Sequence, residues 1–512
     1  MSLSTLHDRL LKQYARLIGA LGDPARRTRT ILWLAAGYAV AWWIYAVVAK
    51  SSQGINADMA EMVVWGRNFD WGYPKHPPLL GWVLGIWFAV FPNADWAFHL
   101  LAALTLASGI ALSFLLAGEW LDKDKRALVP FLLAMIPFYN FLGLKFDQNS
   151  ALIPLWALTT WAFVRSLDTR RAGFAVLAGA GAAAAMLTKY WSGFFVLALI
   201  AAALFDRRRN VYFRSAAPWI TTGVGALLIA PHVVWLIKNN FPPLNWVGTR
   251  RISQSVFDAL GSLMEYSFGT LGYCAFALIV FWIYVRPSPA GLRASAFATQ
   301  TERRRASIIF WTPLLAPIAL AFALRTNLLS LWNTPALALL PVMLMASPLV
   351  KVTRDAAARI AATAVTFTLL VVLVSPIIAG VTLRLGVENH AAFARGVADK
   401  VQSEWAATSG KPLTLVAGPF GLASTASFYL HDKPSTYSDF SPYLAPWLKN
   451  DTLARSGGAV VCPVSDAYCG RNLDMLVARQ RGGRRTEVEV VPHWLWMRGA
   501  PERFLIATLP PQ

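Results

Sequence analysis

Charged residues are scarce in this chain, and their scarcity excludes an ordinary soluble protein. Asp, Glu, Lys and Arg make up 14% of the 512 residues, whereas hydrophobic residues make up 56%. Soluble globular proteins carry about 25% charged residues, because these side chains cover the water-facing surface. We therefore expect lipid to cover much of this chain.

Cysteine is also rare, and neither cysteine nor histidine recurs at the spacing of a metal site. Cys274 lies inside an apolar run, where an inert buried thiol is expected. Cys462 and Cys469 lie close together near the C-terminus, where they would form a disulfide if that segment is outside the cytoplasm. No glycine-rich loop of the nucleotide-binding type is present, so nothing indicates the use of ATP.

The net charge of +20 would suit a nucleic-acid partner, but the positions of the charges exclude one. The basic residues form short runs between apolar segments, as in the loops of a membrane protein that faces anionic lipid. These runs are Arg26-Arg27, Lys123 to Arg126, Arg170-Arg171, Arg207 to Arg209 and Arg303 to Arg305.

Apolar runs long enough to cross a bilayer recur along most of the chain. Residues 1–30 are polar and basic and lack a signal-cleavage site, so we expect a cytoplasmic segment before a retained anchor. The predicted spans are residues 31–49, 96–118, 127–143, 150–165, 173–188, 191–205, 216–237, 271–285, 307–324, 330–349 and 360–383. The sequence therefore predicts an all-α membrane domain, residues 31–383, with about eleven transmembrane helices.

Basic residues alternate between the loops that separate these spans. The loops on the N-terminal side of the predicted membrane hold 24 Lys and Arg, whereas the opposite loops hold 9. The positive-inside rule then predicts a cytoplasmic N-terminus and an external C-terminal segment.

The C-terminal segment, residues 384–512, has the composition of a small soluble α/β domain. Turn-forming clusters separate four short β-like runs, at 413–417, 458–462, 486–491 and 503–507. Residues 397–407 have a helical pattern. We predict a folded external domain with both helices and strands.

The first external loop, residues 50–95, carries the first candidate acids. Asp58 and Glu61 are three residues apart, so on a helix they would share a face. Residues 79–91 are apolar but only about 13 residues long, which predicts an interfacial or re-entrant helix. The alternative is an amphipathic interfacial helix whose acids are merely solvated.

Three further polar positions stand beside predicted spans. Lys145 to Asn149 form a short polar turn with Asp147, and a carboxylate at a membrane edge is costly unless it faces water or a partner. Lys189 follows the fifth span, and Arg250-Arg251 lie in the second long external loop. Their alternative roles are a solvated hairpin for Asp147 and contact with lipid headgroups for the cations.

Carboxylates and cations on one side of a membrane suit the transfer of a sugar from a lipid phosphate. The phosphate is already a good leaving group, so only a base is needed to take the proton of an acceptor hydroxyl. Cations neutralise the charge that develops on the phosphate. The donor itself supplies the energy, which agrees with the lack of an ATP-binding loop.

The order of these motifs resembles the integral-membrane GT-C glycosyltransferases, in the branch of the protein mannosyltransferases and the lipid A aminoarabinose transferase. The resemblance covers roughly residues 31–255 and rests on Asp58, Tyr73 to Leu79, Phe146 to Asn149, and Thr188-Lys189. Within this group, the sequence is most similar to transferases that decorate bacterial lipopolysaccharide, including galacturonic acid transferases.

The resemblance implies an inverting transferase of the bacterial inner membrane, with a polyprenyl-phosphate sugar donor and a lipid A or core acceptor. It implies that Asp58 is the general base, with Glu61 as a second acid, and that Asp147 positions the acceptor or the base. The residues expected to bind the donor phosphate are Lys75, His76, Lys189, Arg250 and Arg251. Those expected to line the acceptor or sugar pocket are Arg67, Tyr73, Gln148, Asn149 and Tyr190.

Two positions depart from the family pattern. Many relatives carry a second acid directly after the first, where this chain has Met59. The aminoarabinose branch has a lysine directly before the double proline, where this chain has His76 preceded by Lys75. Either of these two residues is therefore a candidate for the phosphate contact.

Other functions stay open from the sequence. A transporter or lipid flippase would need polar residues at mid-span or paired broken helices, for which internal prolines are candidates. A non-catalytic scaffold would present the C-terminal domain to an envelope partner. No cofactor is required by any motif, although paired acids could hold a divalent metal. We expect a monomer whose partners are the lipid-linked donor, a lipid or glycan acceptor and membrane lipid, with no nucleic acid.

Overall fold

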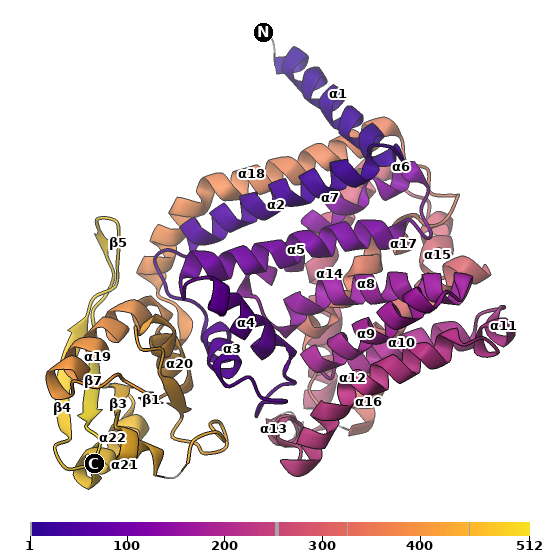
Figure 1. Ribbon diagram of the computed structural model, residues 1–512. Helices are drawn as coiled ribbons and strands as arrows, with labels where there is room; N and C mark the ends of the chain where they lie inside the picture. Colours follow the sequence, from indigo (N-terminus) through magenta and orange to yellow (C-terminus); the bar gives the residue numbers. More distant parts are fainter. Residues whose placement is uncertain (1–2, 251–254, 325, 450) are drawn as a thin grey trace. The chain divides into compact units, whose positions relative to one another are not determined.

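A computed structural model describes residues 3–250, 255–324, 326–449 and 451–512 of the chain (Figure 1). The chain divides into two compact units. Unit 1 comprises Met1–Trp42, Lys75–Pro77 and Leu100–Val372, and unit 2 comprises Trp43–Pro74, Pro78–His99 and Leu373–Gln512. The C-terminal segment therefore forms one compact body with most of the first predicted external loop.

Long apolar helices dominate the described ranges. Six of them have the length and composition needed to cross a membrane, which agrees with the predicted all-α membrane domain. They are α2 (Arg27–Ala49), α5 (Asp95–Ala117), α12 (Ala217–Lys238), α14 (Val256–Val285), α16 (Thr301–Leu324) and α18 (Arg354–Leu385). The remaining predicted spans correspond to shorter or more polar helices, or to interrupted segments.

Three of the shorter predicted spans form continuous helices, α8 (Gln148–Thr169), α9 (Ala172–Thr188) and α10 (Ser192–Leu204). Residues 79–91, predicted to be too short to span, form the 12-residue helix α4 (Leu79–Val90). Further helices of the described ranges are α1 (Leu3–Gly22), α3 (Ala57–Asn68), α6 (Lys123–Arg126), α11 (Arg209–Phe213), α13 (Pro242–Arg250) and α15 (Pro289–Ala296).

Two predicted spans, 127–143 and 330–349, are interrupted rather than continuous helices. The first consists of α7 (Val129–Ala134) and two 3₁₀-helices, η1 (Pro137–Tyr139) and η2 (Gly143–Lys145). The second consists of η3 (Ser330–Leu339) followed by α17 (Leu340–Met345). Pro137 and Pro335 lie within the 3₁₀-helices, and Pro341 lies in the first turn of α17. Proline lacks the N–H that would continue an α-helix from the preceding turn, which favours a break at these positions.

Ion pairs within unit 1 join the ends of three helices whose loops are rich in basic residues. Arg305 of α16 lies 2.7 Å from Asp168 of α8 and 2.5 Å from Asp206, which follows α10. Arg208 also pairs with Asp168, at 2.7 Å. These three loops therefore meet on one side of unit 1, as the alternation of basic residues requires.

We expect Arg305→Met to reduce the free energy of unfolding by about 3 kcal/mol, because it removes the buried cation that pairs with both acids and leaves the buried Asp206 carboxylate with only Arg208, at 3.6 Å. The Arg305 side chain is only 2% exposed and that of Asp206 is 0% exposed. Reversible unfolding in mixed micelles measures the loss, with Arg293→Met at an exposed arginine of α15 as the matched control. A loss no larger than that of the control would show that the cluster does not stabilise the fold.

The C-terminal part of unit 2 contains a five-stranded sheet in the order β2-β1-β3-β7-β4. β1, β2 and β3 are parallel, and β7 runs antiparallel between β3 and β4. The strands are β1 (Leu415–Gly418), β2 (Ser435–Ser438), β3 (Gly458–Pro463), β4 (Arg484–Val490) and β7 (Glu502–Leu509), with a separate hairpin of β5 (His493–Trp494) and β6 (Met497–Arg498).

Helices cover both faces of this sheet, because alternate strand residues point to opposite sides. The helices of the segment are η4 (Glu388–Phe393), α19 (Ala394–Thr408), α20 (Phe420–Tyr429), α21 (Thr452–Ser456) and α22 (Ala467–Arg479). α19 and α20 share a core with one set of strand residues, which includes Val416 and Val461. α22 shares the opposite core with Ala417 and Val460. The four predicted strands and the predicted helix are present.

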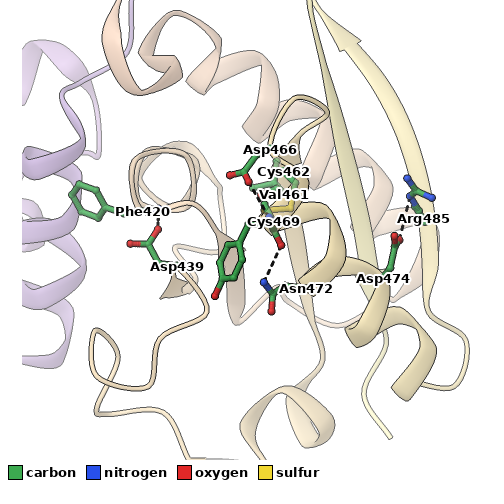
Figure 2. Close-up of a disulfide and its surroundings, with 10 residues drawn as sticks. Phe420, Asp439, Val461, Cys462, Asp466, Cys469, Asn472, Asp474 and Arg485 are labelled. Atoms are coloured by element: carbon green, nitrogen blue, oxygen red, sulfur yellow. Dashed lines mark hydrogen bonds and ion pairs between the residues drawn. A yellow bond between two sulfur atoms is a disulfide. The ribbon is translucent and has the colours of Figure 1, made fainter.

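A disulfide ties β3 to α22 (Figure 2). It joins Cys462 and Cys469, the pair noted in the sequence, whose Cα atoms lie 5.6 Å apart. Asp466 caps α22 by accepting a hydrogen bond of 3.0 Å from the Cys469 N–H, which directs the first turn of the helix toward the strand. Cys274 is a free, buried thiol in α14.

Candidate active site

Asp58 lies in the first turn of α3, in unit 2. The Asn56 side chain caps this helix by accepting a hydrogen bond of 3.0 Å from the Asp58 N–H. The Asp58 side chain is exposed at the N-terminal end of the helix. Glu61 lies one turn later but is only 6% exposed, so the two acids do not share the open face that their spacing predicts.

α3 packs closely against α4, and glycines allow the approach (Figure 1). A Cβ atom at Gly66 would lie 2.6 Å from the Gly81 carbonyl oxygen and from the Gly85 nitrogen. Tyr73 stacks on Trp65 of α3, with ring centroids 5.1 Å apart, and donates a hydrogen bond of 2.9 Å to the Trp65 carbonyl. These contacts fix α3 and its acidic first turn on a rigid support.

Two residues predicted to line the sugar or acceptor pocket make contacts within unit 2. Tyr73 is buried against Trp65 and is only 1% exposed. Arg67 donates hydrogen bonds to the Ser427 hydroxyl at 2.8 Å and to the Pro434 carbonyl at 3.0 Å. Tyr73 is thus buried and Arg67 half-buried, and their role in a pocket stays a prediction.

In unit 1, Asp147 begins α8 as the N-cap of a capping box. Its carboxylate accepts hydrogen bonds from the backbone N–H groups of Asn149, at 2.9 Å, and Ser150, at 3.0 Å. The Ser150 hydroxyl in turn accepts a hydrogen bond of 2.9 Å from the Asp147 N–H. Phe146, directly before Asp147, has a positive φ of 31°, a sparsely populated conformation that bulky residues rarely adopt. This turn places the Asp147 carboxylate at the start of α8.

A chain of polar side chains runs from Asp147 to Lys189. The Asn149 side-chain amide donates to the Asp147 carboxylate at 3.1 Å, and its oxygen accepts from Lys189 Nζ at 2.6 Å. Lys189 Nζ also lies 4.8 Å from the centroid of the Trp332 ring, within range of a cation–π interaction. The structure therefore joins three predicted site residues from two segments, with Gln148 buried next to Asp147 in the chain.

An adjacent pair involves Tyr190 and His232. The Tyr190 hydroxyl lies 2.8 Å from His232 Nε2, and the two rings stack with centroids 5.8 Å apart. Tyr190 is thus held by a histidine of α12, a contact that the sequence did not predict. Burial raises the pKa of the Tyr190 hydroxyl above its usual range, so it stays protonated at neutral pH.

Lys75, like Lys189, lies beside an indole ring in unit 1. Its Nζ lies 5.1 Å from the centroid of Trp246 in α13. His76 is half-buried directly before the double proline. Of the two remaining predicted cations, Arg250 ends α13 with a side chain outside the described atoms, and Arg251 lies outside the described residues.

Trp332 and His232 contact predicted site residues but were not themselves predicted from the sequence. Trp332 lies in a segment predicted as an ordinary span, but the run Trp332-Asn333-Thr334-Pro335 interrupts its apolar pattern and was the available signal. His232 follows Pro231 within the apolar run of α12, and a buried histidine in a span is itself a signal of function. In the parts of the chain that the structure describes, no three His, Cys, Asp or Glu side chains gather as metal ligands would.

Comparisons with known proteins bear on the fold and on the family resemblance. The family of dolichyl-phosphate-mannose-protein mannosyltransferases matches residues 75–235. Over 94% of this chain and 99% of the other, the structure aligns with ArnT from Cupriavidus metallidurans bound to undecaprenyl phosphate, at a TM-score of 0.59 and 15% identity. The chain has the ArnT fold. The predicted resemblance to protein mannosyltransferases and to the lipid A aminoarabinose transferase is thereby confirmed.

Two transferases of Rhizobium johnstonii are similar in sequence. The lipopolysaccharide core galacturonosyltransferase RgtB is 24% identical over 329 residues, which are 59% of this chain and 64% of RgtB. The lipid A galacturonosyltransferase RgtD is 22% identical over 199 residues, which are 39% of this chain and 42% of RgtD. The matches thus span less than two thirds of either relative. With its ArnT fold, the chain is a multi-span membrane protein of that type.

Proposed function

We propose that this protein is an inverting glycosyltransferase that moves a sugar from a polyprenyl-phosphate donor to lipid A or the lipopolysaccharide core. The similarity to RgtB over 329 residues carries the proposal. The ArnT fold supports it, because that structure is bound to undecaprenyl phosphate. Since both sequence relatives are galacturonosyltransferases, galacturonic acid is the sugar to test first.

The proposed reaction needs one base and a binding site for phosphate. The acceptor hydroxyl oxygen attacks the anomeric carbon from the face opposite the phosphate, and the bond from this carbon to the phosphate oxygen breaks. Asp58 takes the hydroxyl proton, and polyprenyl phosphate leaves with the bonding electrons. The exposed position of Asp58 in the first turn of α3 suits a base that must meet an incoming acceptor.

We assign donor-phosphate binding to Lys189 and to Lys75 or His76. The Lys189 ammonium is held by Asn149 and Trp332, and Asn149 is held by Asp147. Such a fixed cation stabilises developing phosphate charge without reorganisation at the moment of reaction. Asp147 therefore acts through Asn149 and Lys189, as a positioning residue rather than as a base.

We further propose eleven membrane passes, a cytoplasmic N-terminal segment of residues 1–30, and a periplasmic domain of residues 384–512. The alternation of basic loops and the disulfide of the C-terminal domain support this orientation in a bacterial inner membrane. The reaction then occurs on the periplasmic side, where lipid-linked sugars replace nucleotide sugars as donors. We propose that the protein works as a monomer.

Mass spectrometry of lipopolysaccharide tests the proposed function in cells. A deletion strain should lack one sugar mass on lipid A or core, and the wild-type gene should restore it. The mass difference identifies the sugar, and fragmentation identifies its acceptor. An unchanged lipopolysaccharide and glycoprotein profile in the deletion strain would contradict the proposal.

Transport is the second candidate function, because two segments of unit 1 are broken helices. Both α7–η1–η2 and η3–α17 interrupt apolar runs, a feature of transporter binding sites. Flipping of a fluorescent polyprenyl-phosphate sugar by purified protein in liposomes, without transfer to any acceptor, would favour this function over the first.

A further inference from the structure

The C-terminal domain makes hydrogen bonds to the segment that precedes α3. Arg395, in α19, donates hydrogen bonds to the Ser51 carbonyl at 3.0 Å and to the Gln53 carbonyl at 2.8 Å. The same guanidinium pairs with the Asp95 carboxylate, at the start of α5. One arginine of the domain thus fixes two carbonyls in the chain that precedes the candidate base.

Tyr429, at the end of α20, joins the same cluster. Its hydroxyl donates to Asp95 at 2.5 Å and accepts a hydrogen bond of 2.8 Å from the Ile55 N–H. Ile55 directly precedes Asn56, the residue that caps α3. Burial, reinforced by the Asp95 carboxylate, holds the pKa of Tyr429 well above its usual range, so its hydroxyl keeps the proton that it donates.

The backbones of the domain and of the segment before α3 also lie in close contact. The Gly54 N–H donates a hydrogen bond of 2.8 Å to the Ala391 carbonyl. A Cβ atom at Gly54 would lie 2.9 Å from the Cβ of Ala394, so only glycine allows this approach without a shift. The hairpin adds a contact, because Trp494 donates from its indole N–H to the Ser51 hydroxyl at 2.5 Å.

The domain also holds the opposite end of α3. Arg67, in the last turn, donates to Ser427 of α20 and to the Pro434 carbonyl before β2. Burial lowers the pKa of Arg67 to about 10, which leaves it charged at neutral pH. Beyond the helix, the Tyr443 hydroxyl donates to the Pro74 carbonyl at 3.4 Å. The helix is therefore held at both of its ends.

We propose that the C-terminal domain is part of the catalytic apparatus, and that Arg395, Tyr429 and Arg67 are positioning residues that fix Asp58 through both ends of α3. We call these three residues, with Asp95, the loop clamp. This inference rests on the proposed role of Asp58 as the base. The loop clamp holds only backbone and structural groups, so its loss displaces the base without removing a group that touches substrate. Misplacement of a reacting group by about 1 Å costs about 10²-fold in rate.

The test compares Tyr429→Phe with Tyr468→Phe in the full-length protein. Tyr468 is an exposed tyrosine of α22 in the same domain, so its change controls for the loss of a hydroxyl. For Tyr429→Phe we expect kcat to fall about 10–100-fold while KM for the lipid-linked donor changes less than about twofold. Arg395→Lys should behave in the same way, against Arg503→Lys at an exposed ion pair of the sheet.

Hydrogen–deuterium exchange of residues 51–68 supplies a second readout that does not depend on activity. We expect exchange in this segment to be faster in Tyr429→Phe than in Tyr468→Phe, with the sheet strands unchanged. Faster exchange with normal kcat, slower turnover with normal exchange, or no change in either would overturn the inference. Wild-type protein without transfer, or Asp58→Asn with full transfer, would instead overturn the proposed function on which the inference rests.

Discussion

Asp58→Asn is expected to lower the rate of sugar transfer about 10²–10⁴-fold, because it removes the proposed general base and keeps its shape. The variant should still fold. The cap of α3 uses the Asp58 backbone N–H rather than its carboxylate, so the helix start does not depend on the acid. The interaction of the charge with the helix dipole is lost, and at an exposed site it is worth only about 0.3–1 kcal/mol.

Asp70→Asn is the matched control for this prediction. Asp70 lies in the same loop, and its carboxylate accepts a hydrogen bond from the Trp71 N–H, an acceptor role that asparagine retains. We expect transfer within about twofold of wild type in this variant, measured by mass spectrometry of the product. Equal transfer by the Asp58→Asn and wild-type proteins would remove Asp58 from the mechanism.

Lys189→Met is expected to lower transfer about 10²–10³-fold, because it removes a fixed cation from the proposed phosphate site. Methionine keeps much of the apolar stem that lies beside Trp332 but loses the ammonium that donates to Asn149. The loss should include a higher KM for the donor, since the phosphate carries its charge before the reaction as well as during it.

Two variants separate charge from packing at this position. Lys189→Arg keeps the positive charge and should retain much more transfer than Lys189→Met, although its fork does not reproduce the single contact with Asn149. Lys238→Met removes an exposed lysine at the end of α12 and should leave transfer within about twofold of wild type. If Lys238→Met is as defective as Lys189→Met, general electrostatic attraction rather than a fixed site would explain the result.

The membrane architecture could be predicted from the sequence wherever apolar length alone decides the structure. The six long helices of the described ranges correspond to predicted spans, and α4 is as short as predicted. Residues 127–143 and 330–349 form interrupted helices, which the sequence did not predict, because hydropathy measures apolar content and not backbone continuity. Within them, prolines and polar neighbours redirect the chain into 3₁₀-helices.

The residues of the polar chain in unit 1 could be predicted from the sequence, but the hydrogen bonds between them could not. Asp147, Asn149 and Lys189 stand out in sequence because polar residues beside spans are costly without a partner. Their hydrogen bonds depend on the packing of α8 against α9, and the contact with Trp332 depends on an interrupted segment 143 residues away in sequence. Spacing along the chain carries no information on either contact.

The contacts of Arg67 and Tyr73 could not be predicted from the sequence. Both belong to a loop whose motifs resemble a transferase family, and that placement suggested a pocket. The partner of Arg67 is Ser427, 360 residues later in the chain. The residues of the loop clamp are also far apart in sequence. Nothing in the sequence of either segment indicates that α19 and α20 contact the loop before α3.

The most direct test of the central claim is transfer by the purified protein from polyprenyl-phosphate-linked galacturonic acid to lipopolysaccharide from the deletion strain. The account predicts that the acceptor gains one galacturonic acid mass, that polyprenyl phosphate is released, and that the Asp58→Asn protein does neither. An acceptor that stays unchanged with folded wild-type protein and a full panel of polyprenyl-phosphate sugars would contradict the account.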